Sequence, residues 1–155
     1  MLKMKGEYRI YEGGKVKGTE IIGGRLIECF HNVICTPVYE TLLKNLNGDT
    51  ATVIGVNYFA FGTGTTTPVE SDIKLETEFF RKAYTSKSWS GKQFVALCQL
   101  KTDEGNGSIT EVGIFAGGSI AADSGTLLSH ALKPIVKNSN IVYNIQYRLT
   151  FSEEE

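Results

Sequence analysis

Ile141-Val-Tyr-Asn-Ile-Gln-Tyr-Arg-Leu-Thr-Phe151 is the clearest alternating stretch of the chain. Its odd-numbered positions are all aliphatic or aromatic, and its even-numbered positions after Val142 are all polar. A period of two over this length predicts a long β-strand with one buried face and one face in water. Antiparallel sheets tolerate a wet face whereas parallel sheets rarely do, so we expect an antiparallel sheet.

Several shorter strand-like segments precede this strand, separated by turn residues. They are Ile54–Phe61, Phe80–Ser88, Gln93–Lys101, Ser108–Ala116 and Thr126–Leu132. Asp103-Glu-Gly-Asn-Gly107 is a strong turn between two of them. Strands at intervals of about a dozen residues predict a mainly β fold (α+β in class), either an antiparallel β-sandwich or a partly closed sheet.

One short helix is predicted to follow Thr36, which suits an N-cap, and to begin with Pro37. Its apolar residues follow the helical period and should cover one face or end of a sheet. They are Val38, Tyr39, Leu42, Leu43 and Leu46. Asn47-Gly48 is a fitting C-cap.

The N-terminal segment is predicted to form a β-hairpin. Gly6–Glu12 and Lys15–Ile22 are strand-like, and Gly13-Gly14 between them is a two-residue turn signal. Because a lone hairpin is marginal in water, it must lean on the main body or on another subunit. We therefore interpret residues 1–30 as a hairpin and attachment arm, and residues 31–155 as a β-rich domain.

Composition narrows the class of protein. The net charge of −1 over 155 residues argues against nucleic acid as a partner, because such binding needs clustered positive charge. No apolar run approaches the roughly 20 residues that span a bilayer, and the N-terminus lacks the apolar core of a signal peptide. We expect no membrane association, synthesis in the cytoplasm, and three cysteines that are reduced and mostly buried.

No arrangement of residues predicts catalysis, a cofactor or a metal. Gly62-Thr-Gly-Thr follows a strand but lacks the Gly-Lys-Ser/Thr ending of a phosphate loop, which favours a simple glycine turn. Cys29, His31 and Cys35 lack the paired cysteine spacings of structural zinc sites. The two histidines stand in no known arrangement with a nucleophile.

A few charged and aromatic residues are candidates for specific roles. Glu78 and Arg81 are close enough in sequence to form an ion pair, and Glu111 could accept hydrogen bonds from backbone or Arg donors. The alternative is a small hydrolase that uses Glu78 or Glu111 as a catalytic carboxylate. Tyr84 and Trp89 suit either a subunit interface or stacking against a sugar.

An ordered set of segments carries a family resemblance. The segments are His31-Asn-Val-Ile, Phe61-Gly-Thr-Gly…Pro68…Leu75-Glu-Thr-Glu78…Arg81-Lys82, Ile109-Thr-Glu-Val-Gly-Ile-Phe115 and Gly125-Thr-Leu-Leu128…Lys137. Over residues 31–151 this succession resembles phage tail-collar and tail-fibre N-terminal domains and similar small virion proteins. The resemblance implies a structural protein of the virion, made in the host cytoplasm, which binds copies of itself and other virion proteins. It implies no catalysis and no cofactor.

A whole fibre is not expected, because no shaft or receptor-binding tip follows Phe151. The chain is expected to be an oligomeric adaptor or accessory protein at the tail, baseplate or collar. A capsid decoration protein is one alternative. A carbohydrate-binding module that contacts a host glycan through Trp89, Tyr84 or Tyr58 is another.

Overall fold

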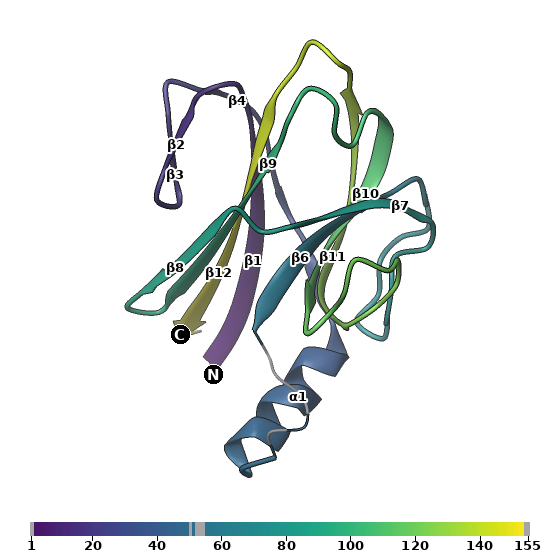
Figure 1. The fold of residues 1–155 in the computed structure, drawn as a ribbon. Coiled ribbons are helices and arrows are strands. Elements are labelled where there is room, and N and C mark those ends of the chain that lie inside the picture. The colour runs from purple at the N-terminus through teal and green to yellow at the C-terminus, as the bar shows by residue number, and fades with distance from the viewer. Residues whose placement is uncertain (1, 50, 52–54, 154–155) are drawn as a thin grey trace. The chain divides into compact units, whose positions relative to one another are not determined.

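The computed structural model describes residues 2–49, 51 and 55–153, so Glu154, Glu155 and Ile54, the first residue of the predicted strand Ile54–Phe61, lie outside the described residues. The chain is mainly β and divides into two compact units, each with a five-stranded sheet (Figure 1). Unit 1 comprises Met1–Asn32, Tyr84–Gly107 and Val136–Glu155, and unit 2 comprises Val33–Ala83 and Ser108–Ile135. The predicted mainly β, antiparallel class with one short helix and an N-terminal hairpin is confirmed. The described residues form two five-stranded sheets and the two-stranded hairpin, which is consistent with a β-sandwich.

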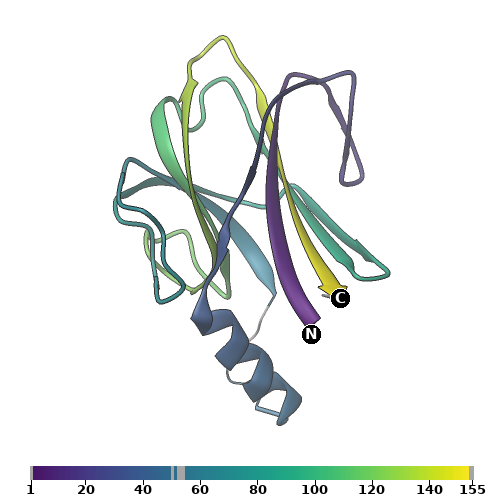
Figure 2. The same cartoon turned by 180° about the vertical axis from the view of Figure 1, so that it is seen from behind.

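The sheet of unit 1 is built around its longest pair of strands. Its order is β4 (Arg25–His31), β1 (Leu2–Glu12), β12 (Tyr143–Glu153), β9 (Gln93–Leu100) and β8 (Ser86–Ser90). Figure 2 shows β1 and β12 side by side, and they pair antiparallel from Leu2 opposite Glu153 to Glu12 opposite Tyr143. The alternation in β12 is confirmed on its apolar face, since Tyr143, Ile145, Tyr147 and Leu149 are all buried.

Aromatic rings fill the interior face of this sheet. The Tyr8 ring stacks on that of Phe30 with centroids 5.3 Å apart and lies 4.8 Å from that of Tyr147. These residues come from β1, β4 and β12, so the packing joins the three strands that hold the N-terminus in the sheet. Such ring pairs stabilise a core beyond the area they bury.

The N-terminal hairpin exists, but the predicted pairing around Gly13-Gly14 was wrong. The hairpin consists of β2 (Lys15–Lys17) and β3 (Glu20–Ile22), and β1 pairs instead with β4 and β12. The long alternating β1 gains more by pairing along its whole length with β12 than with a three-residue strand. Within residues 1–30, β1 and β4 are therefore strands of the sheet itself.

The wet face predicted for β12 was wrong at two positions. Asn144 and Gln146 are buried, because the chain around the hairpin lies on them. The Gln146 side-chain amide donates to the carbonyl of Thr19 at 2.6 Å, and that of Asn144 donates to the carbonyl of Gly13 at 2.7 Å. Buried amides of this kind must find partners, and backbone carbonyls of the hairpin region supply them.

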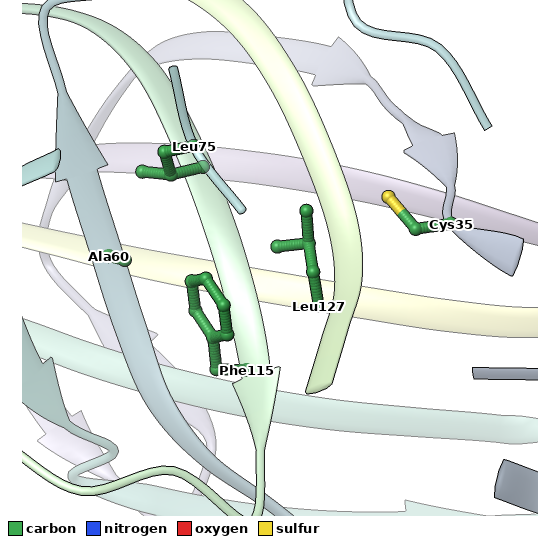
Figure 3. Packing of buried hydrophobic residues seen from close by; sticks show 5 residues of the cluster. All are labelled: Cys35, Ala60, Leu75, Phe115 and Leu127. Atoms are coloured by element: carbon green, nitrogen blue, oxygen red, sulfur yellow. The ribbon is translucent and has the colours of Figure 1, made fainter. Parts of the chain in front are cut away.

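Unit 2 holds the second sheet and the helix. The strand order is β5 (Val33–Ile34), β11 (Thr126–Lys137), β10 (Gly107–Ala116), β6 (Val56–Gly62) and β7 (Glu78–Ala83). Its core includes a cluster of apolar side chains from both strands and loops (Figure 3). The cluster comprises Cys35, Ala60, Leu75, Phe115 and Leu127.

The helix α1 spans Thr36–Leu46, one residue earlier than predicted, with Cys35 rather than Thr36 at the N-cap. No side chain caps it, and the Thr36 amide donates instead to the carbonyl of Glu70 at 2.7 Å. That bond supplies one of the partners that the first turn of a helix lacks. Among the described residues, no helix combines the length and apolar character that crossing a membrane requires.

The predicted strand Phe80–Ser88 is two strands in different sheets. β7 ends at Ala83 and pairs with β6, whereas β8 begins at Ser86 and pairs with β9. Between them the Thr85 amide donates to the carbonyl of Leu97 at 2.6 Å, which aligns the chain with its new partner. A continuous β-favouring composition cannot reveal such a change of sheet.

Candidate functional site

Glu111 lies at the centre of a polar cluster in unit 2. Its carboxylate accepts backbone hydrogen bonds from Gly64 at 3.0 Å, Glu76 at 3.0 Å and Thr77 at 2.7 Å. The side chain has 0% exposure, and the donors come from both ends of the loop between β6 and β7. A buried carboxylate is tolerated when charge-assisted bonds satisfy it, so Glu111 fastens residues 63–77 to β10.

Two glycines make this approach possible. A Cβ on Gly62 would lie 2.3 Å from Glu111 Oε1, and one on Gly64 would lie 2.7 Å from the same oxygen. The Gly62-Thr-Gly-Thr stretch is thus a turn whose backbone holds the chain's own carboxylate. A phosphate could not occupy the same place while Glu111 is there.

His130, from β11, extends the cluster. Its Nε2 lies 2.8 Å from Glu111 Oε2, and its Nδ1 lies 2.8 Å from Asp72 Oδ2. Each ring nitrogen thus faces a carboxylate oxygen, and the imidazole bridges Asp72 and Glu111. Neither ring nitrogen then remains to take a proton from a nucleophile, as a general base must.

A cavity of about 430 Å³ adjoins His130 and is lined also by Asp72, Glu76 and Lys74. Hydrogen bonds from Thr66 lower the pKa of Glu76, because they favour its ionised form. Glu111 does not line this cavity. In this arrangement a hydrolase based on Glu111 lacks access to substrate, since three amides and an imidazole surround its carboxylate.

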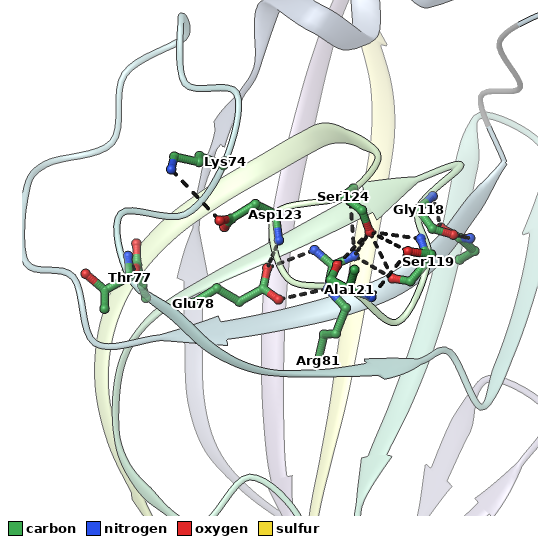
Figure 4. A network of polar contacts seen from close by, with 11 residues as sticks. Lys74, Thr77, Glu78, Arg81, Gly118, Ser119, Ala121, Asp123 and Ser124 are labelled. Carbon is green, nitrogen blue, oxygen red and sulfur yellow. Dashed lines mark hydrogen bonds and ion pairs between the residues drawn. The ribbon is translucent and has the colours of Figure 1, made fainter.

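Glu78 and Arg81 form the second polar cluster of unit 2 (Figure 4). Arg81 Nε and Nη2 donate to the two carboxylate oxygens of Glu78, each at 2.8 Å, and both side chains are 2% exposed. Arg81 Nη1 also donates to the carbonyls of Ser119 at 2.9 Å and Ser124 at 3.0 Å. The guanidinium therefore joins β7 to the loop between β10 and β11.

Two aromatic rings also pack against the guanidinium of Arg81. Its guanidinium carbon lies 4.6 Å from the Phe115 ring centroid and 5.4 Å from that of Tyr58. A planar guanidinium can stack and form a bidentate bond at once, which an ammonium cannot. Tyr58 thus packs on a buried cation, and Glu78 is engaged on both oxygens.

Tyr84 and Trp89 do not form a common platform. The Lys87 ammonium lies 4.4 Å from the centroid of the Tyr84 ring. Trp89 is 79% exposed on the edge strand β8, and it belongs to none of the stacked ring pairs found in the described part of the chain. The structure therefore presents one exposed indole rather than a pair of rings.

The cysteines and histidines considered for metal binding are divided between the two units. Cys29 and His31 lie on β4 in unit 1, whereas Cys35 belongs to the core of unit 2. Within residues 2–49, 51 and 55–153, no group of three or more His, Cys, Asp or Glu is placed to hold a metal ion. All three cysteines are free thiols.

Thiol labelling tests this distribution. Burial, aided by the nearby Asp72 and Glu70 carboxylates, raises the pKa of Cys35 to about 12, and Cys98 is also buried. Partial burial and the Glu7 carboxylate raise the pKa of Cys29 too, but its side chain is exposed, so at about pH 8 we expect a disulfide reagent to modify it slowly and to modify no other cysteine of the native protein. All three thiols should react in denaturant, and rapid native labelling of Cys35 would contradict the described core.

Neither protein-family models, nor curated proteins, nor solved structures match this chain. The pairing of His130 with Asp72 and Glu111 was not foreseen from the sequence. Asp72 lies 58 positions from His130, and no short motif links them. Glu111 and His130 do lie in strand segments rich in buried apolar residues, but Asp72 lies in a mostly exposed loop, so its position gave no such signal.

Proposed function

We propose that this chain is a non-enzymatic structural protein of a bacteriophage particle, an oligomeric adaptor or accessory protein at the tail, baseplate or collar. The resemblance of residues 31–151 to phage tail-collar and tail-fibre N-terminal domains supports a location in the virion. The feature of the structure that carries the proposal is a set of exposed apolar side chains in unit 2, on α1 and on two loops that buried charges order.

The helix α1 contributes an apolar stripe to that surface. Tyr39, Leu43 and Leu46 are 41%, 66% and 77% exposed, and their spacing of four and three residues puts them on one side of the helix. Val38 and Thr41, on the opposite side, are buried. The predicted apolar face of α1 is thus only partly covered, and a monomer leaves the rest in water.

Two loops that buried charges clamp in place carry further exposed apolar side chains: residues 63–77, held by Glu111, and residues 117–125, held by Arg81. Val69 and Ile73 belong to the loop that Glu111 fastens, and Ile120 belongs to the loop that Arg81 fastens; they are 51%, 68% and 73% exposed. Apolar residues on ordered loops lose little conformational freedom on binding, which favours association. The buried charges order these loops, and ordered loops with exposed apolar side chains suit a binding surface.

We assign the α1 stripe to contact with a second copy of the chain. An eleven-residue helix is about 16 Å long, so its stripe alone is far below the roughly 800 Å² per partner of a standard interface. Repetition in a symmetric ring multiplies such a weak contact through avidity. A subunit of a virus particle makes weak contacts that are repeated in this way.

Polar substitution of the stripe should weaken self-association. We expect the purified protein to form an oligomer in multi-angle light scattering, and Leu43→Ser with Leu46→Ser to shift it toward monomer by at least tenfold in dissociation constant. Ile22→Ser, at a 57% exposed position of the hairpin in unit 1, is the matched control. A wild-type monomer at about millimolar concentration would overturn the proposed self-association.

Capsid decoration remains the alternative location, because it requires the same kind of surface contact. A reconstruction of the intact particle would place the subunit on the head or the tail. A carbohydrate-binding module is less well supported, since Trp89 stands alone and Tyr84 contacts Lys87.

A further inference from the structure

The sheet of unit 1 carries a cavity of about 260 Å³ on its polar face, with Lys5, Arg9 and Arg148 in its wall. Its volume is slightly below the roughly 300–1,000 Å³ typical of small-molecule sites, which suits a small ligand. None of these residues belongs to the clamps or the apolar surface of unit 2.

Strand register brings the lining side chains together. Glu7 of β1 stands opposite Arg148 of β12 on one side and His31 of β4 on the other. In the next row of this face, Lys5 stands opposite Thr150, which in turn stands opposite Gln93 of β9. Positions two apart on a strand share a face, so four strands contribute to one polar patch.

Positive charge is in excess in this patch. Lys5, Arg9 and Arg148 face the single carboxylate of Glu7. Partial burial raises the pKa of Glu7, but the hydrogen bond and charge of Arg9 outweigh it and lower the pKa overall. Glu7 is thus ionised and engaged with Arg9, so Lys5 and Arg148 keep uncompensated charge.

The Arg148 guanidinium is held in place. Its Nε donates to Gln146 Oε1 at 2.8 Å, and the buried Gln146 amide is itself anchored to the carbonyl of Thr19. Among the described residues, no hydrogen bond engages its two terminal nitrogens, the Lys5 ammonium or the His31 ring. A fixed guanidinium with free terminal donors is the group that binds an oxyanion in bidentate fashion.

We propose that this cavity binds the phosphate group of a small sugar phosphate. Arg148 and Lys5 would hold the phosphate, and Gln93 and Thr150, which are joined by a 3.2 Å hydrogen bond, would offer polar atoms to the sugar hydroxyls. A nucleic acid would need an extended basic track rather than one small cavity, and the net charge of −1 provides none. The site adds a ligand-binding role to the assembly role.

Titration of the full chain, followed by amide NMR shifts and calorimetry, tests the site. The probes are glucose 6-phosphate, inorganic phosphate, glucose and a short single-stranded oligonucleotide. We expect glucose 6-phosphate to bind most tightly, inorganic phosphate more weakly and glucose not at all. Binding should weaken as salt is added, because the patch is exposed. Shifts should centre on the four strands that line the cavity.

Arg148→Gln and Lys5→Gln should each weaken glucose 6-phosphate binding by about tenfold or more, because each removes a charge-assisted bond. Lys101→Gln, at an exposed position of unit 1 outside the cavity, is the matched control and should change nothing. Unchanged circular dichroism would show that the variants fold. No binding by wild type at about 10 mM, equal loss in the control, or tighter binding of the oligonucleotide would each overturn the proposal. None of these outcomes bears on self-association, since the α1 stripe belongs to unit 2.

Discussion

Glu111→Ala is expected to lower the free energy of unfolding by about 3–5 kcal/mol, a large part of the total stability of a domain. The substitution leaves three backbone N–H groups, of Gly64, Glu76 and Thr77, without their acceptor. It also leaves the imidazole of His130 with one carboxylate instead of two. Removing one partner of a buried charged network costs more than the net value of its bonds, because the remaining groups stay desolvated.

Equilibrium unfolding in denaturant measures the loss, and hydrogen exchange locates it. The amides of Glu76 and Thr77 should exchange much faster in the variant, because residues 63–77 lose their attachment to β10. His130→Gln is a milder variant, useful if Glu111→Ala fails to fold. Glu70→Ala, at an exposed position of the same loop, should stay within about 0.5 kcal/mol of wild type. A loss below about 1 kcal/mol in Glu111→Ala would show that the cluster is not a clamp.

The clamp also connects stability with the proposed assembly. Val69 and Ile73, which expose apolar side chains, lie within the loop that Glu111 orders. Loosening this loop should weaken any interface that uses it, even though Glu111 itself is buried. A buried residue can in this way affect binding through the surface that it positions.

Local sequence patterns predicted the features that depend on residues close together in the chain. The alternation of Ile141–Phe151 identified β12 and its buried face, and the helical period identified α1 within one residue. Glu78 and Arg81 are three residues apart, so their proximity could be expected from the sequence. Each of these inferences depends on residues within one element or its immediate neighbour.

The inferences that failed depend on contacts between distant parts of the chain. Gln146 reads as a solvent-facing residue until the carbonyl of Thr19, 127 positions away, is seen to lie on it. Gly13-Gly14 has the local sequence of a hairpin turn. The pairing that prevails, of β1 with β12, joins the two ends of the described chain and therefore leaves no local signal. Loop-closing contacts of this kind leave no local periodicity in the sequence.

Arg81→Met is the second substitution expected to have a large effect, about 3–5 kcal/mol of unfolding free energy. Methionine keeps much of the packing against Phe115 but leaves the Glu78 carboxylate buried without its cation. It also leaves the carbonyls of Ser119 and Ser124 without the Nη1 donor, so the loop at 117–125 should become mobile. Arg81→Lys should recover only part of the loss, since an ammonium cannot bind both carboxylate oxygens and stack.

A double-mutant cycle separates the ion pair from its surroundings. Glu78→Gln alone should also destabilise, but Glu78→Gln combined with Arg81→Met should cost less than the sum of the single losses, because no unpaired charge then remains buried. Arg25→Ala is the matched control: its ion pair with Glu12 is 74% exposed on the arginine side, and exposed pairs contribute about 0–1 kcal/mol. Strict additivity in the cycle would mean that Glu78 and Arg81 hold the loop independently, Glu78 through the Asp123 amide and Arg81 through the Ser119 and Ser124 carbonyls.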